Sequence, residues 1–153
     1  MKWVKQSIHY WCPDTKEHKF LGQNVTVAIL DTGISPHPDF KGRILSFRDF
    51  SNTTGSSEKV LFSFSHFSPL IDNSGHGTHV AGILAGSGLL SSGTYAGIAP
   101  FCNLIIGKVL DQNGNGSIKN VINGIQWIRD IYTQFHIRII NISVGTRPDL
   151  SIH

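Results

Sequence analysis

The sequence DNSGHGTHVAG at residues 72–82 joins a polar turn to small and apolar residues that can start a buried helix. His76 lies at the junction between the turn and the predicted helix. Gly75 and Gly77 flank it, and glycine lets the backbone turn sharply while keeping other side chains away from the imidazole. We therefore expect His76 to be held by a rigid element and to open onto a crevice.

A short apolar run at residues 25–30, VTVAIL, predicts a buried strand upstream of this helix. The run contains two valines and an isoleucine, and it stops at the sequence Asp31-Thr32-Gly33. The Asp31 carboxylate therefore lies at the carboxyl end of a predicted strand. Open α/β sheets place their ligand sites at this position.

Further segments extend the pattern of strands and helices. Residues 42–50 and 138–144 predict two more strands, and residues 103–110 form a continuous apolar run typical of a parallel strand buried on both faces. Between the last two strands, Ser117 is well placed to cap a helix whose apolar residues recur at helical spacing as far as Ile131. The strand-helix-strand unit should cross over with the right-handed sense.

The segments around Asp31 and His76 together resemble the subtilisin-like serine proteases, whose catalytic residues follow along the chain in the order Asp, His, Ser. The resemblance continues in GIAP at 97–100, GKVL at 107–110, GNGS at 114–117, NGI at 123–125 and INISVG at 140–145. It implies a three-layer α/β fold with a mostly parallel central sheet, truncated before its C-terminal part. Residues 25–153 would form this partial catalytic domain, preceded by an arm at residues 1–24.

The resemblance implies that Asp31 is the orienting acid and His76 the general base of a peptide-hydrolysing triad. The family's nucleophile lies in a Gly-Thr-Ser-Met-Ala-type stretch, and its oxyanion-hole asparagine lies shortly before that stretch. The sequence ends at His153, before both. We therefore expect the family to be that of serine endopeptidases. We expect the 153-residue chain alone to be inactive. The alternative is a non-catalytic scaffold that binds a peptide or a partner chain.

Members of this family bind the substrate polypeptide as an added strand between two backbone edges. The matching positions are Asn115, Gly116 and Ser117 on one side and Ser143, Val144 and Gly145 on the other. Their small residues suit a close backbone approach. The reaction itself requires no cofactor.

A structural calcium ion is the metal that the resemblance suggests. Asp39 lies in a His-Pro-Asp loop like the one whose aspartate helps to bind calcium in some members, although a turn carboxylate that caps backbone amides is the interpretation we favour. His79 follows His76 at a metal-like spacing, but no glutamate stands beside it, so we expect a structural hydrogen bond instead. Residues 111–116 begin like a calcium loop, and Ile122 occupies the position of the required glutamate.

An aspartic protease is a rival interpretation, because an apolar strand followed by Asp31-Thr32-Gly33 is also typical of that class. It would leave the histidines at 76 and 79 unexplained. Aspartic proteases are also essentially all-β, whereas residues 117–131 have strong helical spacing. We rank this interpretation below the serine protease.

The composition is that of one globular domain: 153 residues, 40% hydrophobic, with a formal net charge of +3. The basic residues are scattered, so nothing indicates nucleic-acid binding. No run reaches the length of a membrane span, and residues 1–10 lack the apolar core of a secretory signal, which favours a cytoplasmic protein without a membrane partner.

The apolar residues of 1–24 recur at neither helical nor strand spacing, so we expect this segment to form an extended arm. Free thiols are favoured over a disulfide for Cys12 and Cys102.

The strand at residues 139–142 carries a further expectation. In the fold that the resemblance implies, later strands and helices cover this strand. Without them it would present an apolar edge and bare faces, a recognised liability for pairing with other chains. We therefore expect the isolated chain to self-associate or to need a complementary fragment.

Overall fold

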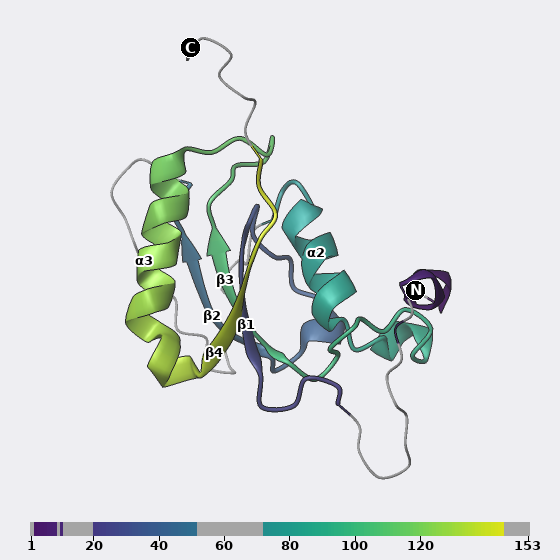
Figure 1. Ribbon diagram of the computed structural model, residues 1–153. Helices are drawn as coiled ribbons and strands as arrows, with labels where there is room; N and C mark the ends of the chain where they lie inside the picture. The colour runs from purple at the N-terminus through teal and green to yellow at the C-terminus, as the bar shows by residue number, and fades with distance from the viewer. Residues whose placement is uncertain (1, 9, 11–19, 52–71, 146–153) are drawn as a thin grey trace.

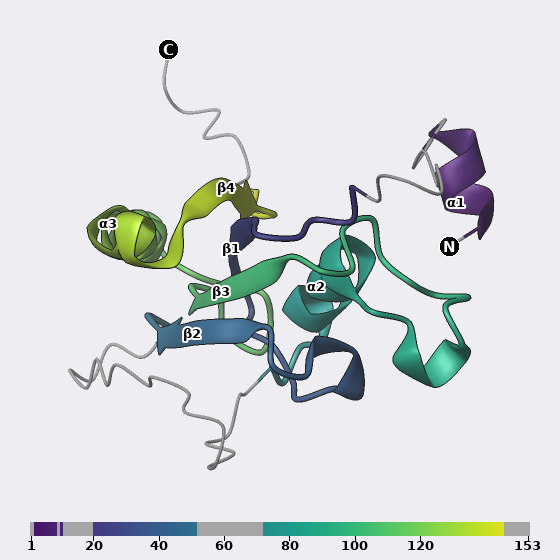
Figure 2. The same cartoon turned by 90° about the horizontal axis from the view of Figure 1, so that it is seen from below.

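The computed structural model describes residues 2–8, 10, 20–51 and 72–145, which form a parallel sheet with a helix on either face (Figures 1 and 2). The strands are β1 (Thr26–Asp31), β2 (Ile44–Asp49), β3 (Asn103–Lys108) and β4 (Ile137–Ile142), in the spatial order β2-β3-β1-β4. The helices are α1 (Lys2–Ser7), α2 (His76–Ala85) and α3 (Ile118–Phe135), with short 3₁₀ turns at Pro38–Phe40 and Leu89–Ser91. The predicted α/β class with a mostly parallel sheet is confirmed.

The two faces of β1 belong to two separate hydrophobic cores. Val27 and Ile29 pack in the core that contains α2, whereas Ala28 and Leu30 pack in the core that contains α3. All four are nearly or completely buried, and each fully buried Leu or Ile side chain contributes about 1.5–3 kcal/mol. Because side chains alternate along a strand, Asp31 lies on the α2 face, where His76 begins its helix.

Helix α3 begins as predicted at a serine cap. The Ser117 hydroxyl accepts a hydrogen bond from the Asn120 amide at 3.2 Å, which satisfies one of the free amides of the first turn. Trp127, Ile128 and Ile131 then pack against the sheet. The helix continues beyond the predicted end at Ile131 to Phe135, and Phe135 still packs against the same core.

The edge strand β4 corrects one prediction. Residues 138–144 were expected to form a buried strand, and β4 does pair in parallel with β1, but Ile139, Ile140 and Ile142 are 53%, 43% and 41% exposed. The reason is position, since β4 ends the strand order and no described strand pairs with its outer side. The described part of the chain therefore has the exposed apolar edge that we expected.

The N-terminal segment is also different from the prediction. It was expected to be extended, but Lys2–Ser7 form the short helix α1, in a stretch that contains neither glycine nor proline. The Lys5 ammonium donates to the Gly97 carbonyl at 2.9 Å, and the Tyr10 hydroxyl donates to the Ile98 carbonyl at 2.7 Å. The consecutive backbone carbonyls of Gly97 and Ile98 thus hold α1 and Tyr10 against the loop that precedes β3.

The expectation of free thiols can be compared with the structure at one of the two cysteines. Cys102 is a buried free thiol, and Cys12 lies outside the described residues. Within the ranges described, no helix is both long and apolar enough to cross a lipid bilayer.

The exposed apolar edge of β4 predicts that the 153-residue chain associates with itself at micromolar concentration. We expect the double substitution Ile140→Lys and Ile142→Lys to shift the chain toward monomer in analytical ultracentrifugation, because lysine on an edge opposes strand pairing. Ile83→Lys on α2 is the matched control, since Ile83 is also 41% exposed. A wild-type chain that is already a stable monomer would contradict the prediction.

Candidate active site

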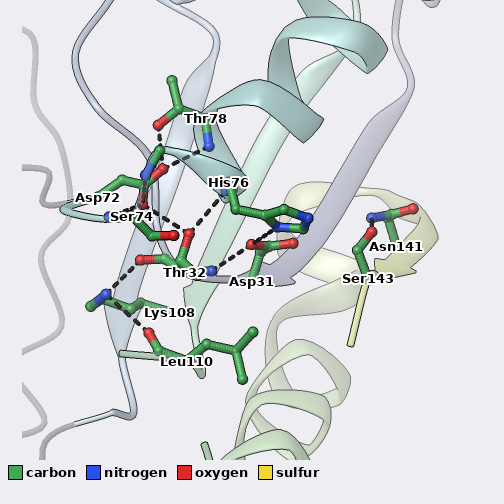
Figure 3. Close-up of polar contacts among 12 residues, drawn as sticks. Asp31, Thr32, Asp72, Ser74, His76, Thr78, Lys108, Leu110, Asn141 and Ser143 are labelled. Carbon is green, nitrogen blue, oxygen red and sulfur yellow. Dashed lines mark hydrogen bonds and ion pairs between the residues drawn. The ribbon is translucent and has the colours of Figure 1, made fainter. Parts of the chain in front are cut away.

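The fold brings Asp31 and His76 into direct contact, although 45 residues separate them in the sequence (Figure 3). The distance from His76 Nδ1 to Asp31 Oδ1 is 2.7 Å. The aspartate side chain is completely buried, whereas the histidine side chain is 53% exposed. Because Nδ1 contacts the carboxylate, Nε2 is the ring nitrogen left for a group outside the protein.

The Asp31 carboxylate has a second partner in its own chain. The Thr32 amide donates to the same oxygen, Oδ1, at 2.7 Å. The other oxygen, Oδ2, is buried and accepts no hydrogen bond from the described residues. A buried carboxylate that lacks part of its hydrogen bonding is stabilised by a positive partner, and a protonated His76 is such a partner.

The environment raises the pKa of His76 above its ordinary value. The main cause is the hydrogen bond to Asp31, followed by the negative charge of Asp31, and the charge of Asp72 adds to the effect. Partial burial acts in the opposite direction. The contact thus stabilises the imidazolium form relative to a histidine in water, which suits a group that takes up a proton during a reaction.

Glycine is required on each side of His76 for a different structural reason. Gly75 precedes α2 with φ at +83°, a conformation that glycine adopts readily, so the predicted sharp turn is confirmed. Gly77 is helical, and it is needed because α2 approaches the end of β1 closely. A Cβ atom at Gly77 would overlap the carbonyl oxygen of Gly33 and would lie 3.2 Å from Cβ of Asp31.

Sequence reasoning missed Asp72, which organises the turn before α2. Its side chain is buried and accepts hydrogen bonds from the hydroxyl of Thr32 at 2.8 Å, from the amides of Ser74 and Gly75, and from the amide and hydroxyl of Thr78. The pKa of Asp72 is lowered: burial alone would raise it, but the hydrogen bonds from Thr78, Thr32 and Gly75 outweigh burial. An aspartate just before a helix start is a known signal for such a turn.

The predicted substrate-binding segments lie on the same edge of the sheet as Asp31, because each follows the carboxyl end of a parallel strand. The described residues of both segments, 115–117 after β3 and 143–145 after β4, are exposed. Asp111 shapes the first segment, since its Oδ1 accepts hydrogen bonds from the amides of Asn113 and Asn115 at 2.8 and 2.9 Å. At the start of the second, the side-chain amide of Asn141 donates through Nδ2 to the Ser143 hydroxyl at 2.8 Å.

Asp39 serves as a loop anchor. Its Oδ2 accepts a hydrogen bond from the Gly88 amide at 3.0 Å, and its backbone carbonyl accepts one from the Ser87 amide. Its Oδ1 is buried and accepts no hydrogen bond within the described part of the chain, and the Arg43 guanidinium donates to its backbone carbonyl. His79, which we expected to make a structural hydrogen bond, is exposed. In the ranges that the structure covers, no three His, Cys, Asp or Glu side chains gather as a metal site.

Comparison with known proteins gives one consistent family. Residues 22–151 match the model of the subtilase family, peptidase S8. Serine protease AprX of Bacillus subtilis is 45% identical over 106 residues, which are 69% of this chain and 21% of that protein. The major intracellular serine protease of the same organism is 37% identical over 131 residues, 84% of this chain and 36% of that protein.

Solved structures agree with these relatives. The structure of the Clostridium perfringens CspB protease is similar with a TM-score of 0.74 and 26% identity, over 92% of this chain and 32% of that one. Sphericase is similar with a TM-score of 0.68 and 29% identity, over 85% of this chain and 40% of that one. The chain thus spans well under half the length of each of these four proteins.

Gly77→Ala is predicted to destabilise the chain and to separate His76 from Asp31, because the added methyl group would overlap Gly33. We expect a loss of about 1–3 kcal/mol in the free energy of unfolding, measured in urea. Gly82→Ala is the matched control in the same helix, since a Cβ atom there meets nothing within 4 Å. That substitution should stabilise by about 0.5–1 kcal/mol. Equal effects of the two substitutions would contradict the close-approach role of Gly77.

The raised pKa of His76 predicts a pH dependence of stability. When the folded-state pKa of a histidine is raised, its contribution is complete below the unfolded value of about 6.5 and is lost as the pH rises through the folded value. We expect the difference in unfolding free energy between wild type and Asp31→Asn to shrink as the pH rises from about 5 to about 9. Urea titrations at several pH values measure it, and a constant difference would contradict it.

Proposed function

The chain belongs to the subtilase family, and we propose that it supplies Asp31 and His76 to the Asp-His-Ser triad of a serine endopeptidase. The observation that carries the proposal is the 2.7 Å contact between a buried carboxylate and a half-exposed imidazole. The fold places this pair at the carboxyl edge of a parallel sheet, where α/β proteins bind their ligands.

His76 acts as the general base in the proposed reaction. Its Nε2 takes the proton of a serine hydroxyl as that oxygen attacks the scissile carbonyl, and it later gives the proton to the leaving amine. Asp31 holds Nδ1, which fixes the tautomer, and its charge stabilises the imidazolium that forms in between. The raised pKa of His76 supports this role.

The serine nucleophile comes, in this proposal, from a segment outside the 153 residues. Without it the chain alone is inactive, since removing the serine of such a triad lowers turnover by about 10⁶-fold. The polypeptide substrate lies between the segments at 115–117 and 143–145, with its backbone paired to theirs. Their exposure and their place beside Asp31 at the sheet edge support this position.

The proposal is tested by joining this chain in frame to the part of the B. subtilis major intracellular serine protease that follows its matched region. We expect the chimera to hydrolyse a chromogenic peptide and to react with a serine-directed fluorophosphonate. His76→Ala should lower turnover by about 10⁶-fold and Asp31→Ala by about 10⁴-fold.

Lys119→Ala, an exposed change at the start of α3, is the matched control and should leave turnover unchanged. Circular dichroism confirms that each chimera is folded. A folded chimera that reacts with the fluorophosphonate and keeps its turnover without His76 would contradict the proposed role of this residue.

A further inference from the structure

Thr32 follows Asp31 in the chain, and its amide, hydroxyl and carbonyl all make hydrogen bonds beside the Asp31–His76 pair. Its amide donates to Asp31 Oδ1 at 2.7 Å. Its hydroxyl donates to Asp72 Oδ1 at 2.8 Å and accepts from the Gly77 amide at 2.9 Å. Thr32 directly follows Asp31, and Gly77 directly follows His76. The hydrogen bond from the Gly77 amide to the Thr32 hydroxyl therefore links the two backbone segments that carry Asp31 and His76.

The direction of these hydrogen bonds depends on Asp72. A hydroxyl has one proton, and here the buried carboxylate of Asp72 takes it. The lone pairs of the hydroxyl then face the Gly77 amide, which is one of the free amides at the start of α2. Asp72 also binds the Gly75 and Thr78 amides, so the same carboxylate holds the turn on both sides of His76.

Lys108 holds Thr32 from the opposite side. Its ammonium group is buried and donates to the Thr32 carbonyl at 2.5 Å and to the Leu110 carbonyl at 3.0 Å (Figure 3). Lys108 lies on β3 directly opposite Asp31 in the strand register. A buried ammonium is costly unless it is hydrogen-bonded, so its two carbonyl acceptors must stay in place. Thr32 is thus fixed between a buried positive and a buried negative group.

We propose that Thr32 is a positioning residue, whose hydroxyl, oriented by Asp72, sets the approach of His76 to Asp31. This role in catalysis rests on the proposed function, but the positioning itself is a property of the described chain. A hydroxyl at this place can donate to Asp72 and accept from Gly77 at once. Valine has the shape of threonine and can do neither, whereas serine can do both.

The pKa of His76 is the readout, because it depends on the contact with Asp31 and on the charge of Asp72, the two charged groups that raise it. It is measured by an NMR pH titration of the His76 ring protons, in the 153-residue chain and its variants carrying Ile140→Lys and Ile142→Lys, which we expect to keep the chain monomeric. We expect Thr32→Val to remove at least half of the upward shift, and Thr32→Ser to retain the shift. Asp72→Asn should also lower the pKa, since the negative charge and one of the two acceptor oxygens are lost.

Thr26→Val is the matched control, since it makes the same substitution at a buried threonine at the other end of β1. It should leave the His76 pKa unchanged. Thr32→Ala removes the hydroxyl without adding a methyl group beside Gly77, and it replaces Thr32→Val if that variant does not fold. A folded variant without the hydroxyl and with a wild-type His76 pKa would overturn the positioning role. A wild-type pKa that is not raised would instead contradict the Asp31–His76 pair and the proposed function.

Discussion

The hydrogen bond between a fully buried carboxylate and a half-exposed imidazole is the interaction on which the site depends. Asp31 is removed from water and keeps one oxygen without a hydrogen bond from the described residues, so it favours a positive charge on its neighbour. His76 faces the solvent with its other ring nitrogen available. The pair can therefore take up a proton from outside the protein and hold it, which is what a general base must do.

The fold creates this contact through backbone proximity. The alternation of side chains along β1 sends Asp31 to the face that α2 covers, and Gly77 lets the helix start approach the strand end at Gly33. The Thr32 hydroxyl then donates to Asp72 and accepts from the Gly77 amide, which fixes the turn before the helix. The site lies where a strand end and a helix start are joined by hydrogen bonds of buried polar groups.

The sequence predicts those features that depend on local patterns. Asp31 ends an apolar run and His76 stands between two glycines, and the resemblance of these two segments to the subtilisin-like proteases singled out both residues without the structure. The links of Asp72 to Thr32 and of Gly77 to Gly33 were not found, because they join residues about 40 or more positions apart, and local spacing carries no such information. The exposure of β4 was partly missed for a related reason. An apolar run predicts a strand, but it does not say which neighbours cover it.

The central claim is that the Asp31–His76 pair is two thirds of a serine protease triad. The nucleotide sequence of the coding region beyond the codon for His153 tests it most directly. The claim predicts an in-frame segment with a Gly-Thr-Ser-Met-Ala-type motif, whose serine would complete the triad. A stop codon at that point, with no separate gene for a complementary segment, would leave the pair without a nucleophile and would contradict the claim.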